Sequence, residues 1–375
     1  MKNKTKLILT TVLLSASLLA GCKKGEEEKL FFGFGSEATF VENAAGLNSA
    51  KTAVVNGYVQ TDIDFGAVLV DSKGVIKQFR LDVVQIKALA SAKEDDTIKD
   101  ATVLMGATHD TANQDTKTKW ELLDAYNMKV ASPIEKEWYL QAEAFENWVA
   151  GKTLAEVKAG LEEVIHHGQP ATGVKDGETV GVTIVVDGFM AVLEEALDSK
   201  VEVTGVKAEE AKLGVGSKGS RGSYGNPAMQ DNFTVGGAVF GAGKVVSKAK
   251  IDEYQIPYAP ITETWVTLDN EPVYALEVTV NKAEVQVVEA TSSIRSKHDQ
   301  KEDYAMKVAS PIEKEWYEQA NALVAWLEGK TLDAGFASLA EGENAVTAGC
   351  TMEVASYVHA LGEAEDTAHN PRYVA

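Results

Sequence analysis

A segment of twelve residues that occurs twice in the chain carries side chains suited to a flat ligand. MKVASPIEKEWY stands at Met128–Tyr139 and again, letter for letter, at Met306–Tyr317. A planar ligand needs aromatic faces for stacking, and any phosphate on it needs cations. Each copy of the segment offers both kinds of side chain. The candidate binding residues are therefore Tyr139, Lys136, Tyr317 and Lys314, with Trp138 and Trp316 beside them.

The tryptophans of this segment also have a structural interpretation. A helix is predicted from Pro133, with Ser132 as its N-cap, and Trp138 then lies on the apolar stripe of that helix. Large aromatic residues on such a stripe usually belong to the core. Tyr139 and its counterpart Tyr317 lie off the stripe and are the better ligand candidates. The other members of the stripe are Ile134, Ala142, Phe145 and Val149.

A threonine ends a glycine-containing stretch in each half of the chain. VTAGCT at Val346–Thr351 and DGETVGVT at Asp176–Thr183 both lead into a helical run. The pattern resembles the end of the FMN-binding domain of respiratory flavoprotein subunits and exported flavin lipoproteins, which carries an S/T-G-A-T signature. GVIKQFRLD at Gly74–Asp82 is similar to the opening strands of that family. The resemblance implies that FMN is attached to Thr183 and Thr351 through a phosphoester bond, or that flavin binds without a covalent bond; the alternative is that both are ordinary strand residues.

Other kinds of site find no support in the sequence. None of the six histidines recurs at matching places in the two repeats, so a duplicated catalytic base is not indicated. His166 and His167 are adjacent, which favours a solvated loop over a metal site, and no metal is predicted. A formal net charge of −20 argues against nucleic acid as a partner.

The N-terminus predicts export and lipid attachment. Three lysines precede an apolar run from Leu7 to Ala20 that is too short for a comfortable bilayer span. The run ends in Leu19-Ala20-Gly21-Cys22, which resembles the bacterial lipobox. We therefore expect residues 1–21 to be a signal peptide and Cys22 to be lipidated, with 22–49 as a tether. The protein would then be held on the cell membrane, facing outside the cytoplasm.

The repeat predicts the domain organisation. Weaker likeness extends from the identical segments in both directions, which indicates two duplicated modules at 50–205 and 228–375. Residues 206–227 are rich in Gly and Ser and are expected to be a flexible linker. Alternating apolar residues at 55–70 and 75–85 predict a hairpin, and Thr153–Glu156 predicts a capping box for a further helix with Leu154, Val157, Leu161 and Val164. Each module is therefore expected to be α+β, a twisted antiparallel sheet with helices packed on one face.

These features together predict a lipid-anchored protein that binds a small planar ligand, with FMN as the candidate, for electron transfer or ligand carriage. The redox or protein partner stays open. Two alternatives belong to other classes: a non-catalytic protein that binds a solute or partner, and a structural envelope protein. A hydrolase or transferase is not indicated, because no nucleophile–base pair presents itself.

Overall fold

The computed structural model covers the chain from β1 to the last helix with several gaps. The predicted signal peptide, Cys22 and the first part of the tether lie outside the described residues. Among the described residues, no helix is both long enough and apolar enough to span a bilayer. The structure describes residues 28–43, 46–47, 50, 53–55, 57–90, 92–93, 105–107, 116–221, 230–259, 262–268, 271–282, 284, 287–288, 292–340 and 348–370.

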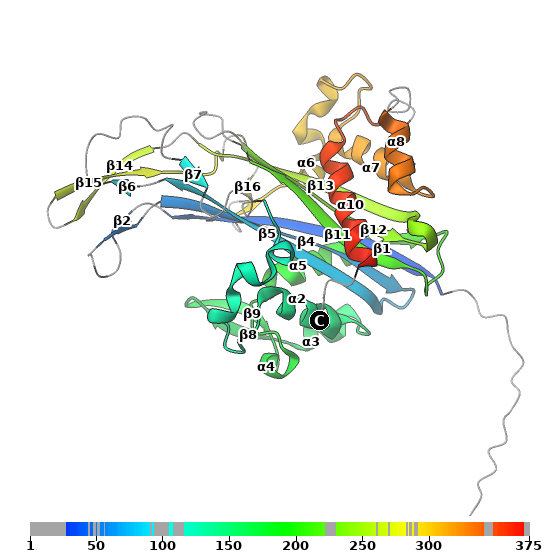
Figure 1. Ribbon diagram of the computed structural model, residues 1–375, viewed down its shortest axis with the longest axis horizontal. Coiled ribbons are helices and arrows are strands. Elements are labelled where there is room, and N and C mark those ends of the chain that lie inside the picture. Colours follow the sequence, from blue (N-terminus) through cyan, green and yellow to red (C-terminus); the bar gives the residue numbers. More distant parts are fainter. Residues whose placement is uncertain are drawn as a thin grey trace, which may run out of the picture.

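Two antiparallel sheets of long strands form the centre of the molecule (Figure 1). In the first sheet, β4 (Gly57–Asp71) lies between β1 (Leu30–Asn43) and β5 (Ile76–Ala90). In the second, β12 (Gln230–Phe240) lies between β11 (Lys212–Ser220) and β13 (Val246–Pro257). The predicted hairpin at 55–70 and 75–85 is confirmed as β4 and β5, joined by a turn that contains Gly74.

The inner faces of the two sheets share one apolar core. Phe34, Phe65 and Val84 of the first sheet belong to the same buried cluster as Val235 and Tyr254 of the second. A Cβ atom on Gly237 would lie 2.7 Å from the Phe34 ring, so the sheets approach closely there. The strands of the central sheets therefore have one face toward the partner sheet and the other toward helices.

A helical layer covers the outer face of each sheet, and the two layers lie on opposite sides of the molecule (Figure 1). The predicted α+β class, with antiparallel sheets and helices on one face of each, is confirmed. A duplication as its origin stays a prediction from the sequence. The first layer holds α1 (Lys119–Leu122), η2 (Leu123–Tyr126), η3 (Met128–Val130), α2 (Trp138–Val149), α3 (Leu154–Ala159), α4 (Gly177–Val180) and α5 (Asp187–Asp198), with the hairpin β8 (Leu161–His166) and β9 (Gln169–Val174). The second holds α6 (Lys297–Gln300), η5 (Lys301–Tyr304), η6 (Met306–Val308), α7 (Trp316–Leu327), α8 (Leu332–Ala340) and α10 (Ala355–His369).

Short strands complete the fold around the two central sheets. Four of them extend the first sheet, at its edges and at the start of β1. Three others form a separate antiparallel sheet that contacts β4 and β5. The elements are β2 (Gly46–Leu47), β3 (Val54–Val55), β6 (Ala92–Lys93), β7 (Met105–Ala107), β10 (Val201–Val203), β14 (Thr262–Leu268), β15 (Glu271–Glu277), β16 (Val287–Val288), β17 (Ser293–Ile294) and the turn η4 (Ala242–Lys244).

Two boundaries predicted from the sequence are wrong. The expected tether at 22–49 contains β1, which pairs with β4 along its whole length. The expected linker at 206–227 contains β11, which pairs with β12. Its glycines are there for close packing, since a Cβ on Gly214 would lie 1.8 Å from the carbonyl oxygen of Ala364 in α10. Gly33 in β1 has the same relation to Ala196 in α5, at 1.6 Å.

The helix predicted from Pro133 begins five residues later, at Trp138. Glu135 has a φ of +53°, which breaks a right-handed helix, and Glu137 takes the N-cap position in place of Ser132. The stripe of Trp138, Ala142, Phe145 and Val149 is buried as predicted, whereas Ile134 is only partly buried. The capping box of Thr153 and Glu156 is confirmed, but its helix ends at Ala159, so Leu161 and Val164 lie in β8.

Candidate ligand-binding clefts

A cleft of about 870 Å³ opens on the outer face of the first sheet, and we call it cleft 1. It lies where α5 begins, because the helical layer covers only part of the sheet. Residues 66–71 of β4 are buried on both faces, whereas Gln60, Asp62 and Asp64 on the outer face remain partly exposed. The floor of cleft 1 is formed by Glu37 and Thr39 of β1 with Asp62 and Asp64 of β4.

A lysine between two aromatic rings forms one wall of cleft 1. Lys119 Nζ lies 5.1 Å from the centre of the Tyr126 ring and 5.5 Å from that of Trp138. Both distances are within the range of a cation–π interaction. The N-cap Thr118 fixes the position of Lys119, because its hydroxyl accepts from Glu121 N in a capping box. Phe189 continues the aromatic wall from α5, edge-on to Trp138.

Carboxyl groups lie near this lysine, and burial together with the nearby charges changes the pKa values of Asp64 and Lys119. Burial raises the pKa of Asp64 to about 7; Lys119 opposes this rise, while Asp62 and Glu37 add to it. Burial alone would lower the pKa of Lys119, but Tyr126, Asp62 and Asp64 outweigh it and the net shift is upward. Cleft 1 therefore holds a charged lysine at neutral pH and one carboxyl group that is close to half protonated.

A buried glutamine holds the threonine loop beside the cleft. Gln141 of α2 is fully buried, and its Oε1 accepts from Thr183 N at 2.8 Å and from Thr183 Oγ1 at 3.1 Å. Its Nε2 donates to Ser132 Oγ at 3.1 Å. Gln141 thus ties the turn before α2 to the loop before α5. Thr183 is outside any strand, so the reading of it as an ordinary strand residue is wrong, and the predicted run into a helix is confirmed as α5.

The second sheet has a cleft of about 670 Å³ at the equivalent place, which we call cleft 2. Lys297 Nζ lies 4.8 Å from the Tyr304 ring centre and 5.7 Å from that of Trp316. Gln319 Oε1 accepts from Thr351 N at 2.8 Å and from Thr351 Oγ1 at 3.1 Å, as Gln141 does for Thr183. The same lysine, tyrosine, tryptophan and glutamine geometry therefore occurs twice.

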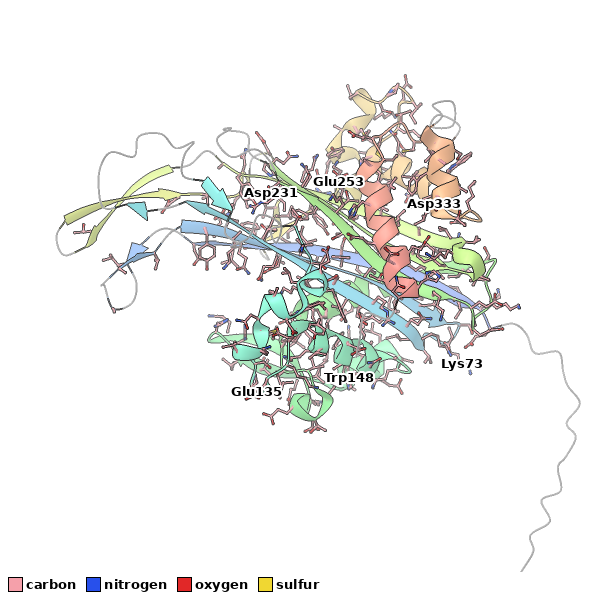
Figure 2. All side chains as sticks on the ribbon, in the orientation of Figure 1. Lys73, Glu135, Trp148, Asp231, Glu253 and Asp333 are labelled. Carbon is pink, nitrogen blue, oxygen red and sulfur yellow. The ribbon has the colours of Figure 1, made fainter. Side chains whose placement is uncertain are left out.

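Cleft 2 contains a chain of hydrogen bonds that has no counterpart among the described residues of cleft 1. Glu253 of β13, labelled in Figure 2, accepts from Lys297 Nζ at 2.8 Å and from the Tyr357 hydroxyl at 2.8 Å. The Tyr357 hydroxyl accepts in turn from Trp316 Nε1 at 3.0 Å. Burial and the Glu253 carboxylate raise the pKa of Tyr357, so this hydroxyl stays protonated. The equivalent positions in cleft 1 are Val83 and Phe189, which cannot form this chain.

The structure places the predicted ligand residues at different distances from the clefts. Thr183 lines cleft 1, and Thr351 is next to Met352, which lines cleft 2. Lys136 and Lys314 lie over Gly181 and Gly349 in the loops before these threonines, where a Cβ would be 2.8 Å and 3.4 Å from the ammonium nitrogens. The tyrosines are not among the lining residues: Tyr139 donates to Asp124, and Tyr317 donates to Glu302.

The sequence reasoning missed the lysines and tyrosines that do line the clefts. Lys119 and Lys297 stand at the same spacing before the repeated segment, and so do Tyr126 and Tyr304. That shared spacing could have revealed them. His166 and His167 line cleft 1, at the end of β8 and in the turn that follows it. In the described part of the chain, no group of three or more His, Cys, Asp or Glu side chains could hold a metal ion.

Comparison with known proteins gives a partial likeness. No family model matches the chain, and no solved structure matches it. A chlorophenol reductase from Desulfitobacterium hafniense is 31% identical over 132 residues, which are 35% of this chain. The chain covers 37% of the length of that protein. The likeness is therefore to part of a reductase and leaves the activity of this chain to be argued from its own residues.

Proposed function

We propose that this protein is an exported lipoprotein, anchored through Cys22, whose two clefts each bind a planar aromatic ligand for electron transfer or carriage. Flavin is the first candidate for that ligand. The observation that carries the proposal is the repeated cleft: the same lysine, tyrosine and tryptophan stand over the same face of both sheets.

The clefts have the size and chemistry that a flavin requires. Their volumes fall within the range of about 300–1,000 Å³ found for small-molecule sites. Tyr126 and Tyr304 offer aromatic faces, and Lys119 and Lys297 offer a cation beside them. A bound flavin would supply the redox chemistry, while the residues of the chain bind and orient it. The partial likeness to a protein named as a reductase supports a redox role.

We infer that the ligand binds without a covalent bond. The hydroxyl groups of Thr183 and Thr351 donate to buried glutamines, and both threonines thereby fix the loops beside the clefts. Lys136 and Lys314 stand on the loop side of the two clefts, where Lys314 would lie close to a phosphate. Covalent attachment at either threonine is the other outcome of the experiment below.

The test is a visible absorption spectrum and an intact mass of protein purified from its own host. A flavin spectrum without added flavin mass supports the proposal. If the intact mass includes flavin, and Thr183→Ala or Thr351→Ala removes that added mass, the flavin is attached covalently to the substituted threonine. A colourless protein that flavin neither binds nor stabilises contradicts the flavin proposal, and a colourless protein stabilised by another solute favours the binding-protein alternative.

Matched variants locate the ligand. Tyr126→Leu and Tyr304→Leu remove a ring from a cleft, whereas Tyr139→Leu and Tyr317→Leu remove a ring outside the cleft lining. We expect the first pair to weaken flavin binding about tenfold, which corresponds to the loss of one stacking face. Equal effects of both pairs would contradict the placement of the ligand in the clefts.

The lipid anchor is tested separately. Cys22→Ser should release the protein from the membrane fraction.

A further inference from the structure

We infer that the two clefts select planar ligands of different charge: cleft 2 takes the anionic, phosphate-bearing form, and cleft 1 takes the uncharged form. The inference rests on the proposed function, because it requires that both clefts bind a planar ligand. It concerns which member of that ligand class each cleft accepts.

The strand registers establish which floor positions correspond. In the first sheet, Glu37 of β1 is paired with Asp64 of β4. In the second sheet, Lys218 of β11 is paired with Thr234 of β12. The next outward-facing pairs are Thr39 with Asp62 and Ser220 with Asn232. All eight of these residues line their clefts.

Four substitutions between equivalent positions make cleft 2 less negative than cleft 1, and two go the other way, because Val83 and Val185 correspond to Glu253 and Glu353. Glu37 in cleft 1 is a lysine in cleft 2, Asp62 is an asparagine, and Asp64 is a threonine. Asp187, at the start of α5, corresponds to Ala355. Cleft 1 is thus lined by four acidic side chains and one lysine. Cleft 2 is lined by two lysines and two glutamates: Lys297 pairs with Glu253, Lys218 stands on the floor among amide and hydroxyl side chains, and Glu353 is the remaining charge.

One local contact is the same in both clefts despite the change in charge. Gln60 Nε2 donates to Asp62 Oδ2 at 3.0 Å, and Gln230 Nε2 donates to Asn232 Oδ1 at 2.6 Å. The two floors therefore share their geometry and differ in charge. Among the described residues, Asp62 Oδ1 is buried without a hydrogen-bond partner. That oxygen suits a ligand with an N–H group and repels a phosphate.

Coulomb's law gives the direction of the selection. A phosphate within about 8 Å of several carboxylates is repelled by amounts that exceed the energy of a single stacking contact. Repulsion of this kind discriminates between ligands that share the same ring. Replacing one carboxylate by a lysine reverses that contribution, so FMN should prefer cleft 2, whereas riboflavin, which has the same ring without phosphate, should enter both.

The experiment is a calorimetric titration with FMN and with riboflavin, on protein whose visible spectrum shows no bound flavin. We expect about two riboflavin sites and one FMN site per chain. Lys218→Glu, which copies cleft 1, should weaken FMN binding at least tenfold and leave riboflavin unchanged. The matched control is Lys212→Glu, an exposed residue of the same strand outside the cleft. Raising the salt concentration should weaken FMN binding alone.

The reciprocal variant completes the test. Glu37→Lys combined with Asp62→Asn copies cleft 2 and should create a second FMN site. Two equal FMN sites in the unaltered protein, or no response to either charge exchange, would overturn the inference while the proposed function stands. If neither flavin binds to any variant, the proposed function itself fails.

Discussion

At the scale of single residues, cleft 1 keeps a destabilising group. Asp64 has a pKa of about 7 in the folded protein against 3.8 for the free side chain. Between these two values the folded chain holds a proton that the unfolded chain has lost. Stability therefore falls as the pH rises from about 4 to about 7, and the loss is complete above pH 7. A group that lowers stability and faces a cleft is typical of a binding site.

Asp64→Asn should remove this dependence on pH. Since asparagine does not ionise, the fall in the free energy of unfolding between pH 5 and pH 8 should be smaller than in the unaltered protein. We expect the two falls to differ by about 2 kcal/mol, which is less than the full pKa shift would give because the side chain is partly exposed. Urea unfolding at the two pH values measures it. Asp124→Asn, an exposed site, is the control, and an identical fall in both variants would show that Asp64 is ionised throughout.

Gln141 and Gln319 allow a second prediction at this scale. Gln141→Leu leaves the Thr183 amide and hydroxyl without their buried acceptor, and also removes the donor to Ser132. We expect a loss of about 3 kcal/mol in the free energy of unfolding, and a loss of the same size for Gln319→Leu. Chemical denaturation of both variants checks this. A large loss for one and none for the other would show that the two loops are held differently.

At the scale of elements, the sequence could predict what depends on local pattern. The β4–β5 hairpin, the capping box at Thr153 and the buried stripe of α2 follow from alternation, cap chemistry and helical period. The misjudged elements depend on distant partners. Glycines in β11 indicate flexibility when read alone, but in the fold they let α10 lie against the strand.

Gly214→Ala tests that reason for the glycines. The added methyl group would overlap the carbonyl of Ala364, so α10 must move away from β11. We expect a loss of at least about 3 kcal/mol in the free energy of unfolding. Gly362→Ala is the control, because a Cβ there has no atom within 4 Å and lies inside α10. The control should gain about 0.5–1 kcal/mol through helix propensity. Equal tolerance at both positions would favour a flexible linker.

The candidate site was predictable only in part for a related reason. The threonines and the repeated segment were visible as sequence identity, and the structure brings Thr183 to the edge of a cleft. The floor of each cleft comes from two paired strands, and which of their side chains face the cleft depends on the register and on the helical layer that covers the sheet. Glu37 could not be assigned to a site because its strand was expected to be a tether.

At the scale of the whole molecule, the two sheets depend on each other. Their inner faces form a single core, and Tyr254 of the second sheet donates a hydrogen bond to Ser36 of the first at 2.9 Å. Separating the halves would expose both inner faces to water. The two clefts therefore lie on opposite sides of one body whose sheets share a core.

This coupling leads to a prediction about unfolding. Phe145→Ala creates a cavity in the first helical layer, and Leu323→Ala does so in the second. Each should cost about 2–5 kcal/mol. If the sheets unfold together, both variants shift the same single transition, with calorimetric and van't Hoff enthalpies in agreement. Two resolved transitions, each shifted by only one of the variants, would mean that the halves fold independently. The shared core argues for one transition, because neither sheet has another surface on which to bury its inner face.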